Sequence, residues 1–228
     1  LLPDTDYNIE VVESAQAGDA STRNEANKGS LSVHTDFEYV TLNVRDFGAY
    51  GNGEHDDTLA IQTAIMACPE NARVYVPAGT YKITTLFLKS NLVLDLAKDA
   101  VLSAFTERER FGILPGMIQS YDEKDEYNLG TWEGNPLDCF TGIITGINVE
   151  NVVITGEGTI DGCASFDNWW KDAKIRKIAW RPRLVFISHC KNVLLHGVTV
   201  TNSPSRSVRL RPFRAVFALT VPGLKVLC

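Results

Sequence analysis

Two adjacent carboxylates, Asp56 and Asp57, form the one Asp-Asp pair of the chain. Paired carboxylates can divide the work of a general acid and a general base. This pair directly precedes apolar residues that recur at helical spacing, namely Ala60, Ile61, Ala64, Ile65 and Cys68. A side-chain oxygen at the start of a helix accepts hydrogen bonds from the first free backbone N–H groups. We therefore predict that the pair caps a helix that Pro69 ends, and that it is not catalytic.

The other candidates for acid–base chemistry also favour structural roles. Asp161 stands between Ile160 and Gly162, where its side chain can bond to the local backbone in an Asx turn. The four histidines lie in polar turns or beside apolar runs, which favours solvated or structural roles for His34, His55, His189 and His196. From residue 202 to the end, the sequence contains no Asp, Glu or His. We therefore assign no catalytic residue.

Size and composition indicate a globular protein. The 228 residues are 44% hydrophobic, which is enough for a sizeable core. There are 22 basic and 28 acidic residues without long runs of one sign, so we expect no nucleic-acid partner. The five cysteines are widely spaced, with no Cys-x-x-Cys and no histidine pair at zinc spacing, so we expect no metal. No apolar stretch is long enough to predict a membrane span.

The first residues differ in character from the rest. Leu2, Pro3, Thr5 and Tyr7 resemble the tyrosine-corner segment near the end of a fibronectin type III sandwich, which predicts the end of such a module over residues 1–14. Residues 15–38 are rich in Ser, Thr, Asn, Gly, Lys and Glu and are predicted to be a linker. We place the main domain at residues 39–228.

The main domain opens with a strand-like run from Tyr39 to Val44, followed by a glycine-rich turn and the predicted helix. Residues 73–81 then predict a strand, a turn and a second strand.

An internal repeat follows, in which an Asn precedes three apolar residues. Asn91, Asn151 and Asn192 align, and each lies eight residues after the start of an apolar, β-rich run. Short β-rich units separated by Gly and Asn turns predict a solenoid, in which each coil covers the apolar face of its neighbour. An Asn at the same corner of successive coils can stack into a hydrogen-bonded ladder.

The unequal spacing of the repeat requires two insertions, at residues 105–137 and 163–183. Both are polar, aromatic and marked by Gly and Pro. Loops that interrupt a rigid solenoid on one side commonly form the walls of a binding groove, so we expect the ligand there.

The chain resembles a known family at these elements. Residues 44–53, Asp56 to Thr58, the helix and residues 76–81 are similar to the entry and capping helix of pectinase-type β-helices, an opening that several families share. More specific are residues 154–162, the Trp169-Trp170 pair, residues 181–184 and residues 201–205, which resemble, in this order, bacterial polygalacturonases of glycoside hydrolase family 28.

The resemblance implies an all-β fold, a right-handed parallel β-helix (pectin lyase-like solenoid) with a short N-terminal capping helix, incomplete at the C-terminus. It also implies inverting hydrolysis of α-1,4-galacturonan in pectin, without a cofactor, by a monomeric extracellular or periplasmic enzyme whose partner is the polysaccharide. Inversion needs a carboxylic acid and a carboxylate. In the family these aspartates belong to an Asn-Thr-Asp and a later Asp-Asp motif, neither of which follows residue 205 here.

The last residues depart from the family pattern. Residues 206–214 contain four arginines, which is typical of neither the preceding coils nor the family, and we call residues 206–228 an atypical tail. A translated frameshift, a truncated gene and a natural divergent end all account for it, with the first two favoured. We expect the chain itself to be an inactive fragment.

Galacturonate carboxylates call for basic residues, and sugar faces stack on aromatic rings. Arg181 and Arg183 bracket Pro182, and a guanidinium there can bind a carboxylate bidentately. Trp169 could stack on sugar. Loop anchoring by the arginines and packing of the tryptophan against the solenoid are the alternatives. Two rival functions also stay open: a calcium-dependent pectate lyase-like enzyme, and a noncatalytic carbohydrate-binding or tailspike-like β-helix.

Overall fold

The computed structural model describes residues 6–12, 28–35, 40–117, 128–206, 208–210 and 219–220. The chain divides into two compact units, Leu1–Tyr39 and Val40–Cys228.

The first unit contains an antiparallel pair of strands, β1 (Asp6–Val12) and β2 (Lys28–His34). The side chains of Ser32 and Asn8 join the strands through a hydrogen bond of 2.7 Å. Strand β2 lies inside the segment predicted as a linker, so that prediction is wrong for Lys28–His34. Its short side chains alternate with Leu31 and Val33, and this alternation suffices for pairing with β1. The fibronectin-like module remains a prediction, because residues 1–5 lie outside the described residues.

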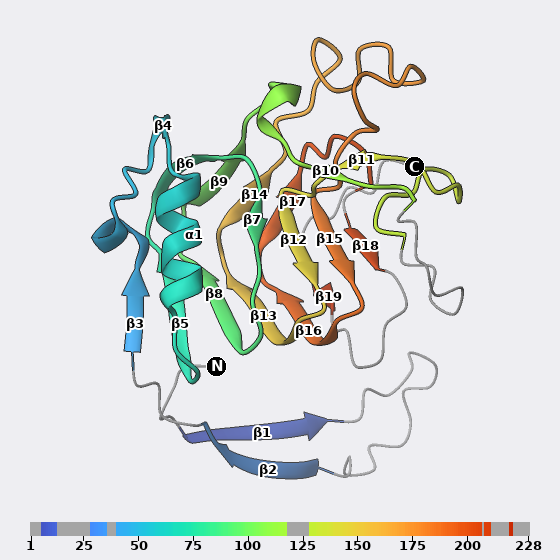
Figure 1. Ribbon diagram of the computed structural model, residues 1–228. Helices are drawn as coiled ribbons and strands as arrows, with labels where there is room; N and C mark the ends of the chain where they lie inside the picture. Colours follow the sequence, from blue (N-terminus) through green and yellow to red (C-terminus); the bar gives the residue numbers. More distant parts are fainter. Residues whose placement is uncertain are drawn as a thin grey trace, which may run out of the picture. The chain divides into compact units, whose positions relative to one another are not determined.

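The second unit is built around three parallel sheets (Figure 1). The six-stranded sheet contains β3 (Val40–Asn43), β5 (Ala72–Val76), β8 (Leu92–Leu96), β13 (Glu150–Gly156), β16 (Lys191–His196) and β19 (Leu219–Thr220). The five-stranded sheet contains β4 (Asn52–Asp56), β6 (Gly79–Ile83), β9 (Ala100–Ala104), β14 (Thr159–Asp161) and β17 (Thr199–Thr201). The four-stranded sheet contains β7 (Leu86–Phe87), β12 (Ile144–Ile147), β15 (Val185–Ser188) and β18 (Val208–Leu210).

From β5 onward the chain visits these sheets in the order six-stranded, five-stranded, four-stranded, and then repeats; in the first passage a helix follows β4 in place of a strand of the four-stranded sheet. Each passage is one coil of a right-handed parallel β-helix, which confirms the predicted fold class. The core lies inside the coils, where apolar residues from successive strands stack in register. Val74, Leu94, Ile154 and Leu195 form one such row, and each is at most 1% exposed.

The N-terminal end of the solenoid carries a 3-10 helix, η1 (Val44–Phe47), and the predicted helix, α1 (Thr58–Ala67). Helix α1 buries Ile61, Ala64 and Ile65 completely, as the apolar spacing predicts.

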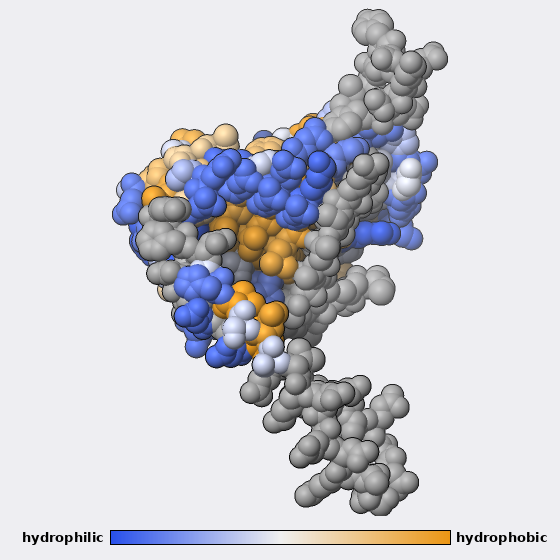
Figure 2. All heavy atoms as spheres, turned by 90° about the horizontal axis from the view of Figure 1, so that it is seen from below, coloured by the Kyte–Doolittle hydropathy of each residue, from blue (hydrophilic) through white to orange (hydrophobic). Residues whose placement is uncertain are grey.

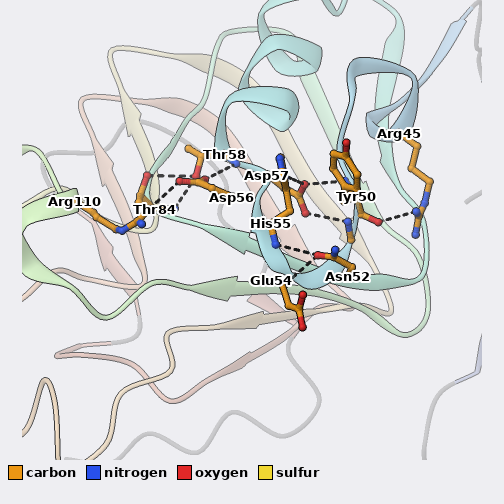
Figure 3. Close-up of polar contacts among 11 residues, drawn as sticks. Arg45, Tyr50, Asn52, Glu54, His55, Asp56, Asp57, Thr58, Thr84 and Arg110 are labelled. Carbon is orange, nitrogen blue, oxygen red and sulfur yellow. Dashed lines mark hydrogen bonds and ion pairs between the residues drawn. The ribbon is translucent and has the colours of Figure 1, made fainter.

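The two carboxylates that precede α1 divide their roles (Figure 3). Asp56 accepts a hydrogen bond from the Thr58 N–H (3.1 Å), so the capping prediction is confirmed for this residue. For Asp57 it is wrong, because its side chain makes no bond to the helix. Asp57 is fully buried and instead accepts hydrogen bonds from the backbone N–H groups of Tyr50 (2.7 Å) and Gly51 (2.9 Å). It therefore anchors the glycine-rich turn.

The repeat of asparagines is confirmed as a ladder along one corner. Asn151 donates to the side-chain oxygen of Asn91, and Asn192 donates to that of Asn151, both at 2.9 Å. All three have a positive φ, between 51° and 57°, which Asn tolerates better than most residues. Asp161 forms the predicted Asx turn with the Cys163 N–H at 2.8 Å.

Both insertions leave the solenoid where the five-stranded sheet passes into the four-stranded sheet, which we call the insertion corner. The first lies between β9 and β12 and contains η2 (Arg108–Arg110), β10 (Ile113–Leu114) and β11 (Cys139–Phe140). The second lies between β14 and β15. In the preceding coil, only Thr84 and Thr85 cross this corner, between β6 and β7. Among the described residues, the two insertions therefore leave the solenoid along the same edge.

Two short strands continue the solenoid into the tail that the sequence marks as atypical. Strand β18 pairs with β15, and β19 pairs with β16, both in parallel. The described parts of the tail thus occupy the positions of a further coil.

Apolar side chains also reach the surface, and Figure 2 shows such patches bordered by hydrophilic residues. The exposed large apolar side chains of the second unit include Leu59 (78%), Phe87 (45%) and Phe166 (84%). Phe87 and Leu59 lie beside the insertion corner.

Candidate functional site

Aromatic and cationic side chains of the two insertions gather at the insertion corner. They stack on one another through guanidinium–ring and ring–ring contacts. We call this group the arginine–tryptophan cluster, and it comprises Arg108, Trp132, Trp169, Trp170, Trp180, Arg181 and Arg183.

Arg181 lies between two rings of the cluster. Its guanidinium carbon is 4.1 Å from the ring centre of Trp170 and 5.2 Å from that of Trp132, which in turn stacks on Trp180 at 4.6 Å. One of its nitrogens, Nη1, donates to the carbonyl oxygen of Pro204 at 2.9 Å. The residue is half-buried. Of the residues predicted to bind a ligand, Arg181 is the one that is both held in place and partly exposed.

Arg183 is only 5% exposed. Its Nη2 donates to the Thr131 carbonyl oxygen at 2.6 Å, and its guanidinium carbon lies 5.3 Å from the Trp132 ring centre. The first insertion encloses the side chain, and this geometry favours the alternative role, loop anchoring, over direct contact with a ligand.

Trp169 is completely buried. Its ring meets Phe111 and Phe140 edge to face, at 5.7 Å and 5.8 Å between ring centres, and the guanidinium carbon of Arg108 lies 4.4 Å from its ring centre. A ring covered in this way has no free face for a sugar, which favours the packing role over stacking on a ligand. Trp169 packs the second insertion onto the first, which is the alternative reading of the sequence.

The cluster is electrostatically unbalanced. None of the ion pairs found among the described residues includes Arg108, Arg181 or Arg183. Burial lowers the pKa of Arg181, and the charges of Arg108 and Arg183 lower it further. Burial also lowers the pKa of Arg108, which the nearby Glu109 partly offsets. Arginine stays protonated in proteins, so the arrangement favours an anion in contact with it.

Buried polar atoms without a hydrogen-bond partner also gather at this corner. Within the described residues there are six such side-chain atoms: Thr131 Oγ1, Trp169 Nε1, Trp180 Nε1, Arg181 Nε, Arg183 Nε and Ser203 Oγ. All belong to the insertions or to the turn after β17. Unpaired buried polar atoms are uncommon and occur at functional sites, so this corner is the candidate site.

Arg108, Trp132 and Trp180 belong to the cluster but were not identified from the sequence. Arg108 lies 61 residues before Trp169, in a run of alternating Glu and Arg that reads as solvated surface. The available signal was the excess of aromatic residues in two insertions that leave the same corner.

The described residues contain no group of three His, Cys, Asp or Glu side chains placed to hold a metal ion. None of their helices combines the length and apolarity that a membrane crossing requires.

Comparison with known proteins connects these features to a family. Residues 41–95 match the family described as rhamnogalacturonase A/epimerase, pectate lyase-like, and residues 121–218 match glycosyl hydrolases family 28. A probable polygalacturonase of Vitis vinifera is 28% identical over 82% of this chain and 38% of the relative. The exo-poly-alpha-D-galacturonosidase of Dickeya chrysanthemi is 31% identical over 91% of this chain and 32% of the relative.

A solved structure agrees with these matches. The family 28 exopolygalacturonase of Yersinia enterocolitica superposes with a TM-score of 0.63 at 25% identity, over 90% of this chain and 41% of that one. The chain therefore spans well under half the length of these three relatives. Fold, family model and relatives thus agree in one resemblance: residues 121–218 are similar to glycosyl hydrolases family 28, and the chain is similar to polygalacturonases over most of its length.

Proposed function

We propose that this chain is part of a polygalacturonase-type glycoside hydrolase, which hydrolyses the α-1,4-galacturonan of pectin with inversion. The observation that carries the proposal is the arginine–tryptophan cluster at the insertion corner of a β-helix that is similar to glycosyl hydrolases family 28. Polygalacturonate presents one carboxylate per sugar. The arginines of the cluster have no acidic partners among the described residues, so they suit the negative charge of this polymer. The neighbouring aromatic rings suit the flat faces of its sugars.

Within the cluster, Arg181 is the proposed contact to a substrate carboxylate. It is partly exposed, and its neighbours hold the guanidinium at a fixed place. Arg183 and Trp169 are proposed to act through others: Arg183 supports the Trp132 ring on which Arg181 also lies, and Trp169 supports Arg108. Both are therefore positioning residues, and their role in substrate binding is indirect.

We do not expect the 228-residue chain to cleave its substrate. Inverting hydrolysis needs two carboxyl groups about 6.5–9.5 Å apart, with a water molecule between one of them and the sugar. The sequence after residue 201 holds no Asp or Glu. Asp57 and Asp161 use their oxygens on backbone N–H groups. The chain is thus proposed to bind the polymer and to leave the chemistry to later coils.

The resemblance carries the remaining expectations: a monomeric protein located outside the cell or in the periplasm, with the polysaccharide as its partner and without a cofactor or nucleic acid. These follow from the family rather than from the geometry.

The test begins with the gene. The DNA after the codon for Cys228, read in all three frames, should encode an Asn-Thr-Asp motif within the next two coils. The protein extended by that reading should release reducing ends from polygalacturonate. Products that absorb in the ultraviolet would show elimination instead and would favour the lyase-like rival. Absence of the motif in every frame, together with binding but no cleavage, would favour the noncatalytic module.

A further inference from the structure

A pocket opens beside the helical cap of the solenoid, apart from the arginine–tryptophan cluster. It is an open depression of about 600 Å³ between the start of α1, the Thr84–Thr85 crossing and η2. Volumes of this size are typical of sites that hold small molecules. Leu59 and Phe87 provide its apolar surface, and Asp56 and Arg110 stand at its polar side.

Phe87 is exposed although its strand is held tightly. Strand β7 is the edge of the four-stranded sheet. The Gln62 side chain closes that edge, because it accepts from the Phe87 N–H (2.7 Å) and donates to the Phe87 carbonyl oxygen (2.9 Å). The backbone of Phe87 is therefore satisfied, and 45% of the residue remains exposed. An aromatic ring presented to solvent by a rigid strand is available for contact with a ligand.

The polar side of the pocket is ordered by a short network (Figure 3). Arg110 pairs with Asp56 at 3.0 Å, and each side chain is 44% exposed. The Arg110 guanidinium carbon also lies 4.2 Å from the Phe105 ring centre. The Thr58 and Thr84 hydroxyl groups approach each other at 3.4 Å. The pocket thus offers fixed donors and acceptors next to an apolar surface.

This combination matches a pyranose ring. Such a ring has an apolar face of C–H groups, which packs on an aromatic side chain, and an edge of hydroxyl groups that both donate and accept hydrogen bonds. An apolar ligand would leave the exposed ion pair without a role, and a simple anion would gain little from a guanidinium that Asp56 already neutralises.

The position of the pocket indicates that its sugar belongs to the polymer bound at the arginine–tryptophan cluster. Thr84 and Thr85 cross the insertion corner one coil before the first insertion leaves it. Neighbouring strands in a sheet are about 4.8 Å apart, comparable to the length of one sugar unit in a polymer. A polysaccharide that lies along the corner at the arginine–tryptophan cluster therefore reaches the pocket within a few units.

We propose that the pocket lined by Phe87, Asp56 and Arg110 is a distal carbohydrate-binding position, which holds a pyranose ring of the same polysaccharide against Phe87. The identity of the polymer rests on the proposed function above. The occupant is a sugar of a long substrate, so the pocket contributes to the binding of long oligosaccharides and not of short ones.

The test compares binding of oligogalacturonates of increasing length to the 228-residue chain by titration calorimetry. Phe87→Ala should weaken binding of hexagalacturonate about five-fold and leave digalacturonate unchanged, which is the size expected for one ring contact. Phe87→Trp keeps a ring and should bind hexagalacturonate at least as well as the unaltered chain. Tyr50→Ala removes another exposed aromatic ring, outside this pocket, and is the matched control.

Equal binding of hexagalacturonate by the unaltered chain and by a folded Phe87→Ala variant would overturn the proposal. So would equal losses for short and long ligands, or failure of Phe87→Trp to bind. A circular dichroism spectrum and melting curve establish that each variant is folded. The failure of this proposal can be distinguished from the failure of the proposed function. If the protein extended beyond Cys228 cleaves nothing but Phe87→Ala still weakens binding of long ligands alone, only the proposed function fails. If the extended protein is active but Phe87→Ala has no such effect, only the proposed role of the pocket fails.

Discussion

Replacing Asp57 by Asn should destabilise the cap of the solenoid. Its two oxygens accept from the Tyr50 and Gly51 N–H groups, and the side chain is completely buried. Asparagine keeps one acceptor and turns an NH2 group toward the other N–H. Leaving one buried donor without its charged partner costs about 2–3 kcal/mol.

The measurement is urea unfolding followed by circular dichroism. With a slope of about 2–3 kcal/mol per molar urea, the midpoint should fall by about 1 M. Asp56→Asn is the matched control: its carboxylate is 44% exposed, so we expect a loss of about 1 kcal/mol or less. Equal shifts for the two variants, or no shift for Asp57→Asn, would refute the anchoring role of Asp57.

Three further predictions concern other parts of the second unit. Asn151→Ala removes two hydrogen bonds of the asparagine ladder and places alanine at a positive φ, so the free energy of unfolding should fall by about 2–3 kcal/mol in the same urea assay. Asn151→Gly loses the same bonds but tolerates the positive φ, so it should cost about half of that; equal costs would show that the positive φ contributes nothing. Gly156→Ala would place a methyl group against the Leu96 carbonyl oxygen of the preceding coil, so we expect insoluble protein. Gly134→Ala has open space around its methyl group and should stay soluble. A soluble, folded Gly156→Ala variant would contradict the close approach of these two coils. Burial raises the pKa of Cys163. Alkylation of this residue by iodoacetamide, followed by mass spectrometry, should therefore reach half its maximal rate at a higher pH than alkylation of a free thiol does. A half-maximal rate at a lower pH would show that the pKa of Cys163 is lowered instead.

Local and periodic features were predictable from the sequence. The helix after Asp57, the asparagine ladder and the two insertions follow from spacing, which the sequence displays directly. Strand β2 was missed because its short polar residues read as a linker, and only pairing with β1 reveals it.

Contacts between distant loops were not predictable. Arg108 meets Trp169 because both insertions leave the same corner, and no local pattern encodes that meeting. Burial of Arg183 and Trp169 was also hidden, because arginine and tryptophan occur both inside loops and on binding surfaces. The sequence therefore located the corner through its insertions, and the structure decided which side chain is exposed there.

The most direct test of the proposed role of this chain is calorimetric titration with trigalacturonate. We expect the 228-residue chain to bind it, Arg181→Met to bind about tenfold more weakly, and the exposed Arg176→Met control to be unchanged. Methyl esterification of every carboxyl group removes the charge that Arg181 is proposed to contact. The fully esterified trisaccharide should therefore bind the unaltered chain about tenfold more weakly than trigalacturonate does, as weakly as trigalacturonate binds the Arg181→Met variant. Equal binding of the acidic and esterified sugars, or no effect of Arg181→Met on a folded protein, would contradict recognition of the substrate carboxylate at the insertion corner.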